Sequence, residues 1–179
     1  MAEVILALDL PHPDDARRLL DRIPELRWVK VGPALLTRAG APFVQELRRR
    51  RLQVFLDLKW HDIPNTVARA SAEAARLGVA MLDLHLSGGA AMIRRAVDEV
   101  EATCTLNQIR RPALLGITVL TSLGDESLPA LGIQRTAQEQ VLASGFVPDE
   151  LANRYAEVSD ELLGAIEREQ PTLSLGGRS

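Results

Sequence analysis

Residues 54–66 read VFLDLKWHDIPNT and combine two patterns. The first three side chains are apolar, as expected for a strand buried on both faces, which is typical of parallel sheets. Four ionisable residues, Asp57, Lys59, His61 and Asp62, follow at once. Charges at the end of a buried strand are costly unless they are paired or belong to a polar site. We therefore expect this segment to end a central strand at the edge of a functional site.

Short apolar runs of strand length recur along the chain, and amphipathic helical patterns separate them. This alternation predicts an α/β protein with a parallel sheet covered by helices, or a barrel with helices outside. We favour a (β/α)8 TIM-barrel type that is incomplete, because only about five strands are recognisable and eight are needed. The expected strands are 4–8, 28–31, 54–58, 79–86 and 113–120, and helices are expected over 13–23, 35–47 and 67–77.

The C-terminal part has a different pattern. We expect residues 1–142 to form the partial barrel and residues 143–179 to form a helical tail of the same domain. A long amphipathic stripe begins near Pro148 and stops at Pro171, which indicates one C-terminal helix. Only residues 172–175 resemble a further strand.

Composition excludes several classes of protein. Hydrophobic residues make up 46% of the chain and charged residues 25%, an ordinary globular balance. The net charge of -3 and the scattered basic residues argue against nucleic-acid binding. No apolar run approaches the roughly 18 residues of a membrane span, and the N-terminus lacks a secretion signal. The single cysteine, Cys104, excludes an internal disulfide, so we expect a cytoplasmic protein.

Spacing also predicts which charges meet. Asp57 and Lys59 are two residues apart, so in a strand they point to the same side. Lys30 ends the neighbouring strand and is a natural partner for Asp57, whereas Asp62 could hold Lys59 from its far side or from another subunit. Two interpretations remain open at this point: a buried ion-pair network that only fixes strand register, or a site that handles negative charge and protons.

The segment DLKWHDIPNT resembles the DxKxxDIPxT signature of the orotidine 5'-phosphate decarboxylases. The DxKxxD part is shared with sugar-phosphate relatives, and HDIPNT is more particular to the decarboxylases. The similarity extends over residues 3–142. Its further segments are ILALDL at 5–10, VKVGPALLTRAG at 29–40, LGVAMLDLHLSGGAAM at 77–92, ITVLTSL at 117–123 and LGI at 131–133.

The resemblance implies a barrel enzyme that works as a homodimer, with no metal or cofactor. It implies a lyase that converts orotidine 5'-monophosphate to uridine 5'-monophosphate in pyrimidine synthesis. In this family, the residue at Asp57 lies beside the substrate carboxylate and disfavours its charge. The residue at Lys59 donates a proton to C6 when carbon dioxide leaves, and the one at Lys30 holds Asp57 and reaches the ribose.

The resemblance assigns four further positions. Asp9 accepts a hydrogen bond from a ribose hydroxyl, and Thr121 lies close to the pyrimidine. Asp62 and Thr66 are contributed across the dimer interface to the partner's site.

The sequence departs from the family after residue 142. We find neither the PGIR segment nor the VGR-type segment whose arginine grips the substrate phosphate, although Arg178 in the closing GGRS is faintly similar. Because remote phosphate binding supports catalysis in such mechanisms, we expect turnover to fall drastically without these phosphate-binding elements. Two alternatives stay open: a metal-dependent sugar-phosphate lyase or decarboxylase of the same superfamily, and a non-catalytic remnant that associates through its tail helix.

Overall fold

The computed structural model describes residues 4–144 of the chain. The helix expected between Pro148 and Pro171, the possible strand at 172–175 and Arg178 lie outside the described residues.

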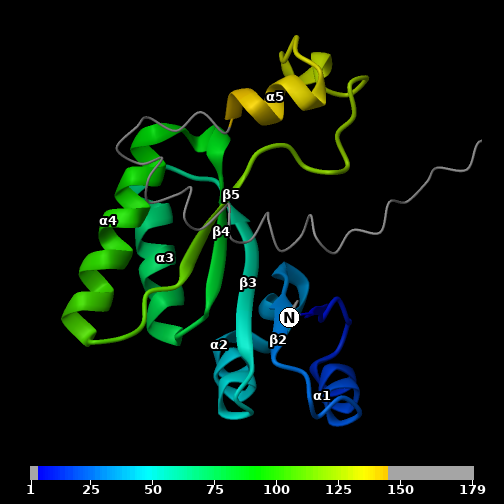
Figure 1. The fold of residues 1–179 in the computed structure, drawn as a ribbon, viewed down its shortest axis with the longest axis vertical. Coiled ribbons are helices and arrows are strands. Elements are labelled where there is room, and N and C mark those ends of the chain that lie inside the picture. The colour runs from blue at the N-terminus through cyan, green and yellow to red at the C-terminus, as the bar shows by residue number, and fades with distance from the viewer. Residues whose placement is uncertain (1–3, 145–179) are drawn as a thin grey trace, which may run out of the picture.

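Five parallel strands form a single sheet in the order β1-β2-β3-β4-β5, so each strand lies beside the next one in the sequence (Figure 1). This order arises when a helix after each strand returns the chain to the end of the sheet at which the strands begin. The prediction of about five parallel strands is confirmed. Their bounds are β1 Ile5–Ala7, β2 Trp28–Val31, β3 Gln53–Trp60, β4 Met81–His85 and β5 Ala113–Ile117.

The helices begin and end where the sequence has residues suited to those positions. The first three begin with a proline, whose missing N–H would have no partner in the first turn. Gly78 ends the third with φ of 72°, a left-handed conformation that glycine adopts without strain. The bounds are α1 Pro13–Asp21, α2 Pro33–Arg49, α3 Pro64–Leu77, α4 Gly89–Asn107 and α5 Ala137–Ser144.

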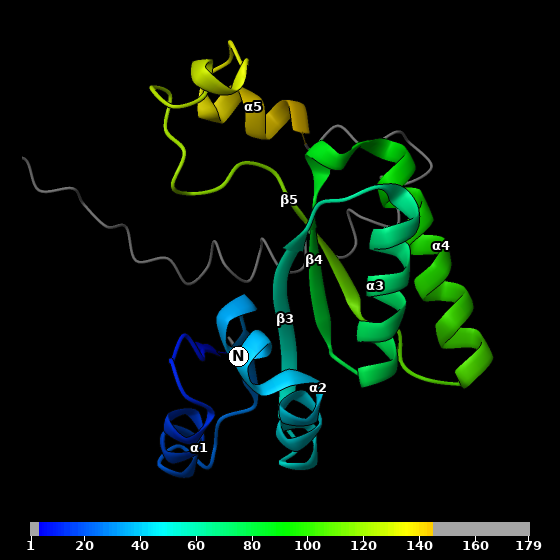
Figure 2. The same cartoon turned by 180° about the vertical axis from the view of Figure 1, so that it is seen from behind.

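Helices and sheet share one apolar core. The helices α3 and α4 lie side by side against the later strands, and α2 lies against the earlier part of the sheet (Figure 2). On the helical side, the core contains buried residues of α2, α3 and α4. Its members from the strands include Val29, Val31, Val54, Leu56, Leu82, Leu84 and Leu114.

The observed strands differ from the expected ones mainly at their carboxyl ends. β3 continues to Trp60, two residues beyond its expected end, whereas β5 stops at Ile117, three residues short. The chain then leaves the sheet through residues 118–136 and reaches α5, which lies beyond the carboxyl end of the sheet (Figure 1). The extension of β3 keeps Lys59 within the strand, at the carboxyl end of the sheet.

Candidate active site

Charged side chains gather where the parallel strands end. Asp9 follows β1, Lys30 lies near the end of β2, and Asp57 and Lys59 lie near the end of β3. Parallel strands place all their carboxyl ends on one face, and barrel enzymes carry their active sites there. The topology therefore collects residues that are far apart in the sequence.

These four side chains form a chain of alternating charge. The Lys30 ammonium donates to Asp57 Oδ2 at 2.8 Å and lies 3.6 Å from Asp9 Oδ2. The Lys59 ammonium donates to the other Asp57 oxygen, Oδ1. The prediction that Asp57 meets both lysines is confirmed. Asp57 is 6% exposed, so both of these ion pairs reach into the protein interior.

The backbone that brings Lys59 to Asp57 is not a regular strand. β3 and β4 pair in register up to Leu56 and again at Trp60, and between these points residues 57–59 lie opposite the single residue Asp83. Lys59 has φ of 49°, in the left-handed region. Bulges of this kind are common beside active sites because they redirect a side chain. The expected contact was right, but the simple alternation from which it was predicted does not hold here.

Asp83 belongs to the same cluster and was missed by the sequence reasoning. It lies in the middle of β4 and is 1% exposed. Its Oδ1 accepts hydrogen bonds from the backbone N–H groups of Leu58 at 2.9 Å and Lys59 at 2.8 Å. A carboxylate within the apolar run 79–86 was the available signal, because a buried carboxyl group needs partners.

The two buried carboxyl groups have opposite proton affinities. Burial raises the pKa of Asp83 to about 7, and the adjacent Asp57 carboxyl group adds to this rise. Burial also opposes the charge on Asp57, yet the neighbouring Asp83 carboxyl group and the ammonium groups of Lys30 and Lys59 prevail and bring its pKa to about 2. Like charges this close cannot both ionise easily. The pair therefore keeps Asp57 ionised and lets Asp83 hold a proton up to neutral pH.

Lys30 is affected by the same groups. Burial alone would lower its pKa, but the hydrogen bond and charge of Asp57, with a contribution from Asp9, raise the pKa overall. The ammonium of Lys30 is thus held in its charged form next to Asp57.

Two histidines lie beside this cluster. The rings of His61 and His85 lie with their centroids 5.4 Å apart and are tilted by 38° relative to each other. Burial lowers the pKa of His85, and the nearby charges of His61 and Lys59 lower it further. A neutral His85 suits the wall of the site.

The structure places the other predicted site residues outside the ion cluster. Asp62, Thr66 and Thr121 are all exposed. The Asp62 carboxylate accepts from the backbone N–H of Ile63 at 2.6 Å and forms an ion pair with none of residues 4–144. Thr66 lies in the first turn of α3, and Thr121 lies in the turn after β5. Whether these residues contribute to the site stays a prediction.

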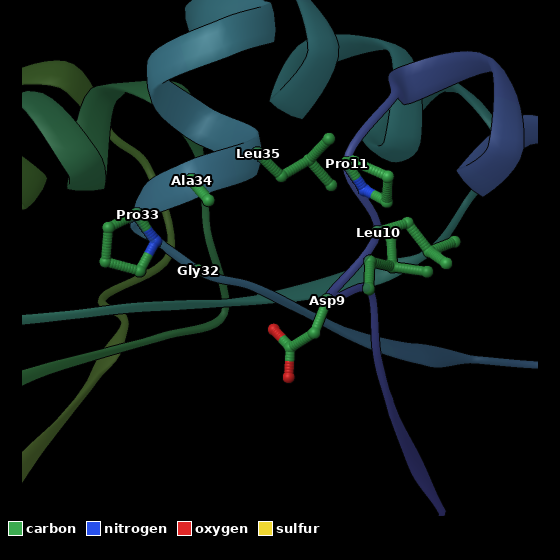
Figure 3. Close-up of a pocket in the computed structure, with 8 residues that line it drawn as sticks. Asp9, Leu10, Pro11, Gly32, Pro33, Ala34 and Leu35 are labelled. Atoms are coloured by element: carbon green, nitrogen blue, oxygen red, sulfur yellow. The ribbon is translucent and has the colours of Figure 1, made fainter.

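A hollow of about 320 Å³ adjoins the first two strands, between the loop after β1 and the start of α2. Figure 3 shows Leu10 and Pro11 on one wall, Leu35 on the other, and the Asp9 carboxylate at the rim. The lining is mainly apolar. The hollow offers space next to the charged cluster, with Asp9 positioned between the two.

The fold and the cluster define a protein of the TIM-barrel type with its charged groups at the carboxyl ends of the strands. Comparison with known proteins agrees. The family model of orotidine 5'-phosphate decarboxylase / HUMPS matches residues 2–168. The chain belongs to this family.

Individual relatives give the same assignment. The orotidine 5'-phosphate decarboxylase of Actinobacillus succinogenes is 46% identical over 142 residues, which cover 79% of this chain and 60% of that protein. For the decarboxylase of Legionella pneumophila, the identity is 45% over 139 residues, covering 77% and 59%. The chain therefore spans about 60% of the length of the curated relatives it matches.

Solved structures agree at the level of the backbone. A crystal structure of orotidine 5'-phosphate decarboxylase from Lactobacillus acidophilus matches with a TM-score of 0.74 and 35% identity, covering 81% of this chain and 66% of that one. An uncharacterized conserved protein from Geobacillus kaustophilus matches with a TM-score of 0.74 and 36% identity, covering 79% and 66%. Among residues 4–144, no helix is long and apolar enough to cross a membrane.

Proposed function

We propose that this chain decarboxylates orotidine 5'-monophosphate to uridine 5'-monophosphate, with Lys59 as the general acid. One observation carries the proposal: the Lys59 ammonium is held on Asp57 at the carboxyl end of the sheet, in a chain that belongs to the decarboxylase family.

The chemistry of the reaction matches this arrangement. When the bond between C6 and the carboxylate breaks, its electron pair stays on C6 in the plane of the ring, where the π system cannot delocalise it. A preorganised positive charge beside C6 stabilises that pair more than it stabilises the substrate, which is the condition for catalysis. Lys59 then transfers a proton from Nζ to C6, carbon dioxide departs, and the amine regains a proton from solvent.

Asp57 has a complementary part in the proposal. A carboxylate that stays ionised, as its pKa of about 2 implies, repels a substrate carboxylate bound beside it. Loss of carbon dioxide relieves this repulsion in the transition state. Lys30 pairs with Asp57 and is proposed to reach the ribose, and Asp9 is proposed to accept a hydrogen bond from a ribose hydroxyl.

We further propose a homodimer with shared active sites. Asp62 and Thr66 are exposed on the segment after β3, and so is Ile63, which is 66% exposed. A subunit interface over this segment would bury Ile63 together with the polar side chains beside it. In this proposal Asp62 and Thr66 reach the partner's site, and Thr121 contacts the pyrimidine of its own site.

We propose a cytoplasmic location as well. The only cysteine, Cys104, is buried and free, which suits a reducing compartment.

An isotope experiment tests the proposed reaction. The purified chain is incubated with orotidine 5'-monophosphate in D2O, and the product is examined by proton NMR and mass spectrometry. We expect uridine 5'-monophosphate with deuterium at C6, because the Lys59 ammonium exchanges with solvent. A parallel incubation with chelator separates this reaction from that of a metal-dependent relative, and we expect the same rate there. Absence of uridine 5'-monophosphate would contradict the proposal.

A further inference from the structure

We propose that Asp83 is a positioning residue whose carboxyl group holds Lys59 against Asp57. The inference rests on the proposed function of Lys59 as the general acid. Asp83 itself does not touch the ammonium in any contact the structure shows, and acts through the backbone of the bulge.

Asp83 provides the hydrogen-bond acceptor of the bulge. In a regular parallel ladder, the N–H groups that point from β3 toward β4 would donate to backbone carbonyls of β4. The bulge at residues 57–59 breaks this ladder, and the N–H groups of Leu58 and Lys59 both donate to Asp83 Oδ1 instead. Because an unpaired buried N–H is costly, the bulge depends on this acceptor.

The backbone of Lys59 is in the left-handed conformation, with φ of 49°. A residue other than glycine is strained in this conformation, and the conformation persists only when the surrounding structure fixes it. The Lys59 N–H to Asp83 bond, at 2.8 Å, acts on the strained residue itself. The same residue carries the ammonium that reaches Asp57. The direction of the ammonium therefore depends on a side chain of the neighbouring strand.

The two carboxyl oxygens of Asp83 have different surroundings. Oδ2 is buried and has no hydrogen-bond partner among residues 4–144. This suits a protonated carboxyl group next to the Asp57 carboxylate. An asparagine has nearly the same shape, accepts through its amide oxygen and donates through its amide nitrogen. Asp83→Asn should therefore reproduce the protonated form and preserve the bulge, whereas Asp83→Ala removes the acceptor.

The lysine content of the chain provides a direct readout. Lys30 and Lys59 are its only lysines, and both belong to the cluster. Protein labelled with 13C at the lysine ε-carbon therefore gives two side-chain signals, one from each ion pair with Asp57. Variants Lys30→Arg and Lys59→Arg assign them. Thr103→Val serves as the control, because Thr103 is buried in α4 and polar like Asp83.

We expect Asp83→Ala to move the Lys59 signal toward the position of a solvent-exposed lysine, with the Lys30 signal unchanged. In the same variant kcat falls by about 100-fold, the scale of a small misplacement of a reacting group, with little change in KM. Asp83→Asn keeps both signals near their wild-type positions and kcat within about tenfold of wild type. Thr103→Val leaves both signals and kcat unchanged.

Three outcomes would overturn the proposal. The first is an Asp83→Ala protein whose lysine signals and kcat match wild type. The second is a shift of both lysine signals together, which shows a general structural role. The third is an Asp83→Asn protein that is folded and yet has its Lys59 signal at the position of a solvent-exposed lysine. If Asp83→Ala does not fold, the Asp83→Asn result alone decides the proposal. If the wild-type chain shows no turnover, the proposed function fails, but the lysine signals still report whether Asp83 places Lys59.

Discussion

Asp57 and Asp83 are the same residue type in one buried cluster, and their surroundings give them different charges. Within residues 4–144, Asp57 contacts two ammonium groups, whereas Asp83 accepts hydrogen bonds from two backbone N–H groups and has Asp57 as its neighbour. The stronger positive surroundings keep Asp57 ionised. The pair therefore carries its proton on Asp83.

This difference predicts how stability depends on pH. The pKa of Asp83 lets the folded state hold this proton up to a pH of about 7, whereas the unfolded state releases it near 3.8, the ordinary value for an aspartate. Between these values, the folded state binds more protons, so the free energy of unfolding falls as pH rises, by at most about 1.4 kcal/mol per pH unit. Asp83→Asn removes this contribution. Urea unfolding at several pH values from 5 to 8 measures it.

We expect Asp83→Asn to gain stability relative to wild type as pH rises, and the gain to level off above neutral pH. Thr103→Val provides the control, because its difference from wild type should not vary with pH. Parallel pH profiles for wild type and Asp83→Asn would contradict the assignment of the proton to Asp83.

At the residue scale, the sequence predicted the ion pairs but not the group that organises them. Lys30 and Asp57 were expected to meet because adjacent parallel strands end at one edge. Asp83 was not recognised because its importance depends on the bulge opposite it. The bulge follows from strand register, which no local pattern in 54–66 reveals.

Among the elements, α4 shows how helices support the sheet that carries the site. Its buried side chains recur every three to four residues and form one stripe toward the core, whereas Leu106 on the same helix is 82% exposed. This spacing places one face of the helix on the sheet and its neighbour α3. The buried residues are Met92, Ile93, Ala96, Val97, Val100, Thr103 and Cys104.

Two substitutions in α4 test this support. Ile93 is 4% exposed and belongs to the core, so Ile93→Ala leaves a cavity and should lower the free energy of unfolding by about 2–5 kcal/mol. Leu106→Ala, the aliphatic control, should change it by less than about 0.5 kcal/mol. Urea unfolding compares the two. Equal effects would show that α4 does not pack on the sheet as described.

Element types were predictable because strand and helix patterns differ in period, and the five strands and the first three intervening helices were predicted by range. For α4, Gly89–Asn107, no range was predicted. Element ends were predicted less well. β3 runs on to Trp60 because its bulge keeps charged residues within the strand, and a pattern of apolar residues stops at Leu58. β5 ends at Ile117 although residues 118–120 include two apolar side chains.

For the whole molecule, the proposed dimer makes the site a property of two chains. Each site would combine Lys59 of one chain with Asp62 of the other, since Asp62 forms no ion pair within the described part of its own chain. In a symmetric dimer the same contact occurs twice. The alternation of strands and helices predicted the arrangement of the sheet, but no pattern in one sequence shows how two copies meet.

Mixing two inactive variants tests the shared site. Lys59→Ala and Asp62→Ala each damage both sites of a homodimer, but a mixed dimer has one site with both residues intact. After subunit exchange at equal concentrations, we expect activity to recover to about a quarter of wild type, because about half of the dimers are mixed and each has one intact site. No recovery, with exchange verified by mass spectrometry, would show that Asp62 acts within its own chain. An Asp62→Ala homodimer with wild-type activity would show that Asp62 does not act in catalysis.

The most direct test of the proposed role of Lys59 compares the turnover of orotidine 5'-monophosphate by wild type and Lys59→Ala. Arg22→Ala is the control, because it removes an exposed cation outside the charged cluster. We predict that the wild type releases carbon dioxide and that Arg22→Ala matches it. We predict that Lys59→Ala loses at least about 1000-fold in kcat, because both the proton and the positive charge beside C6 are removed. Turnover by Lys59→Ala at the wild-type rate would contradict the central claim.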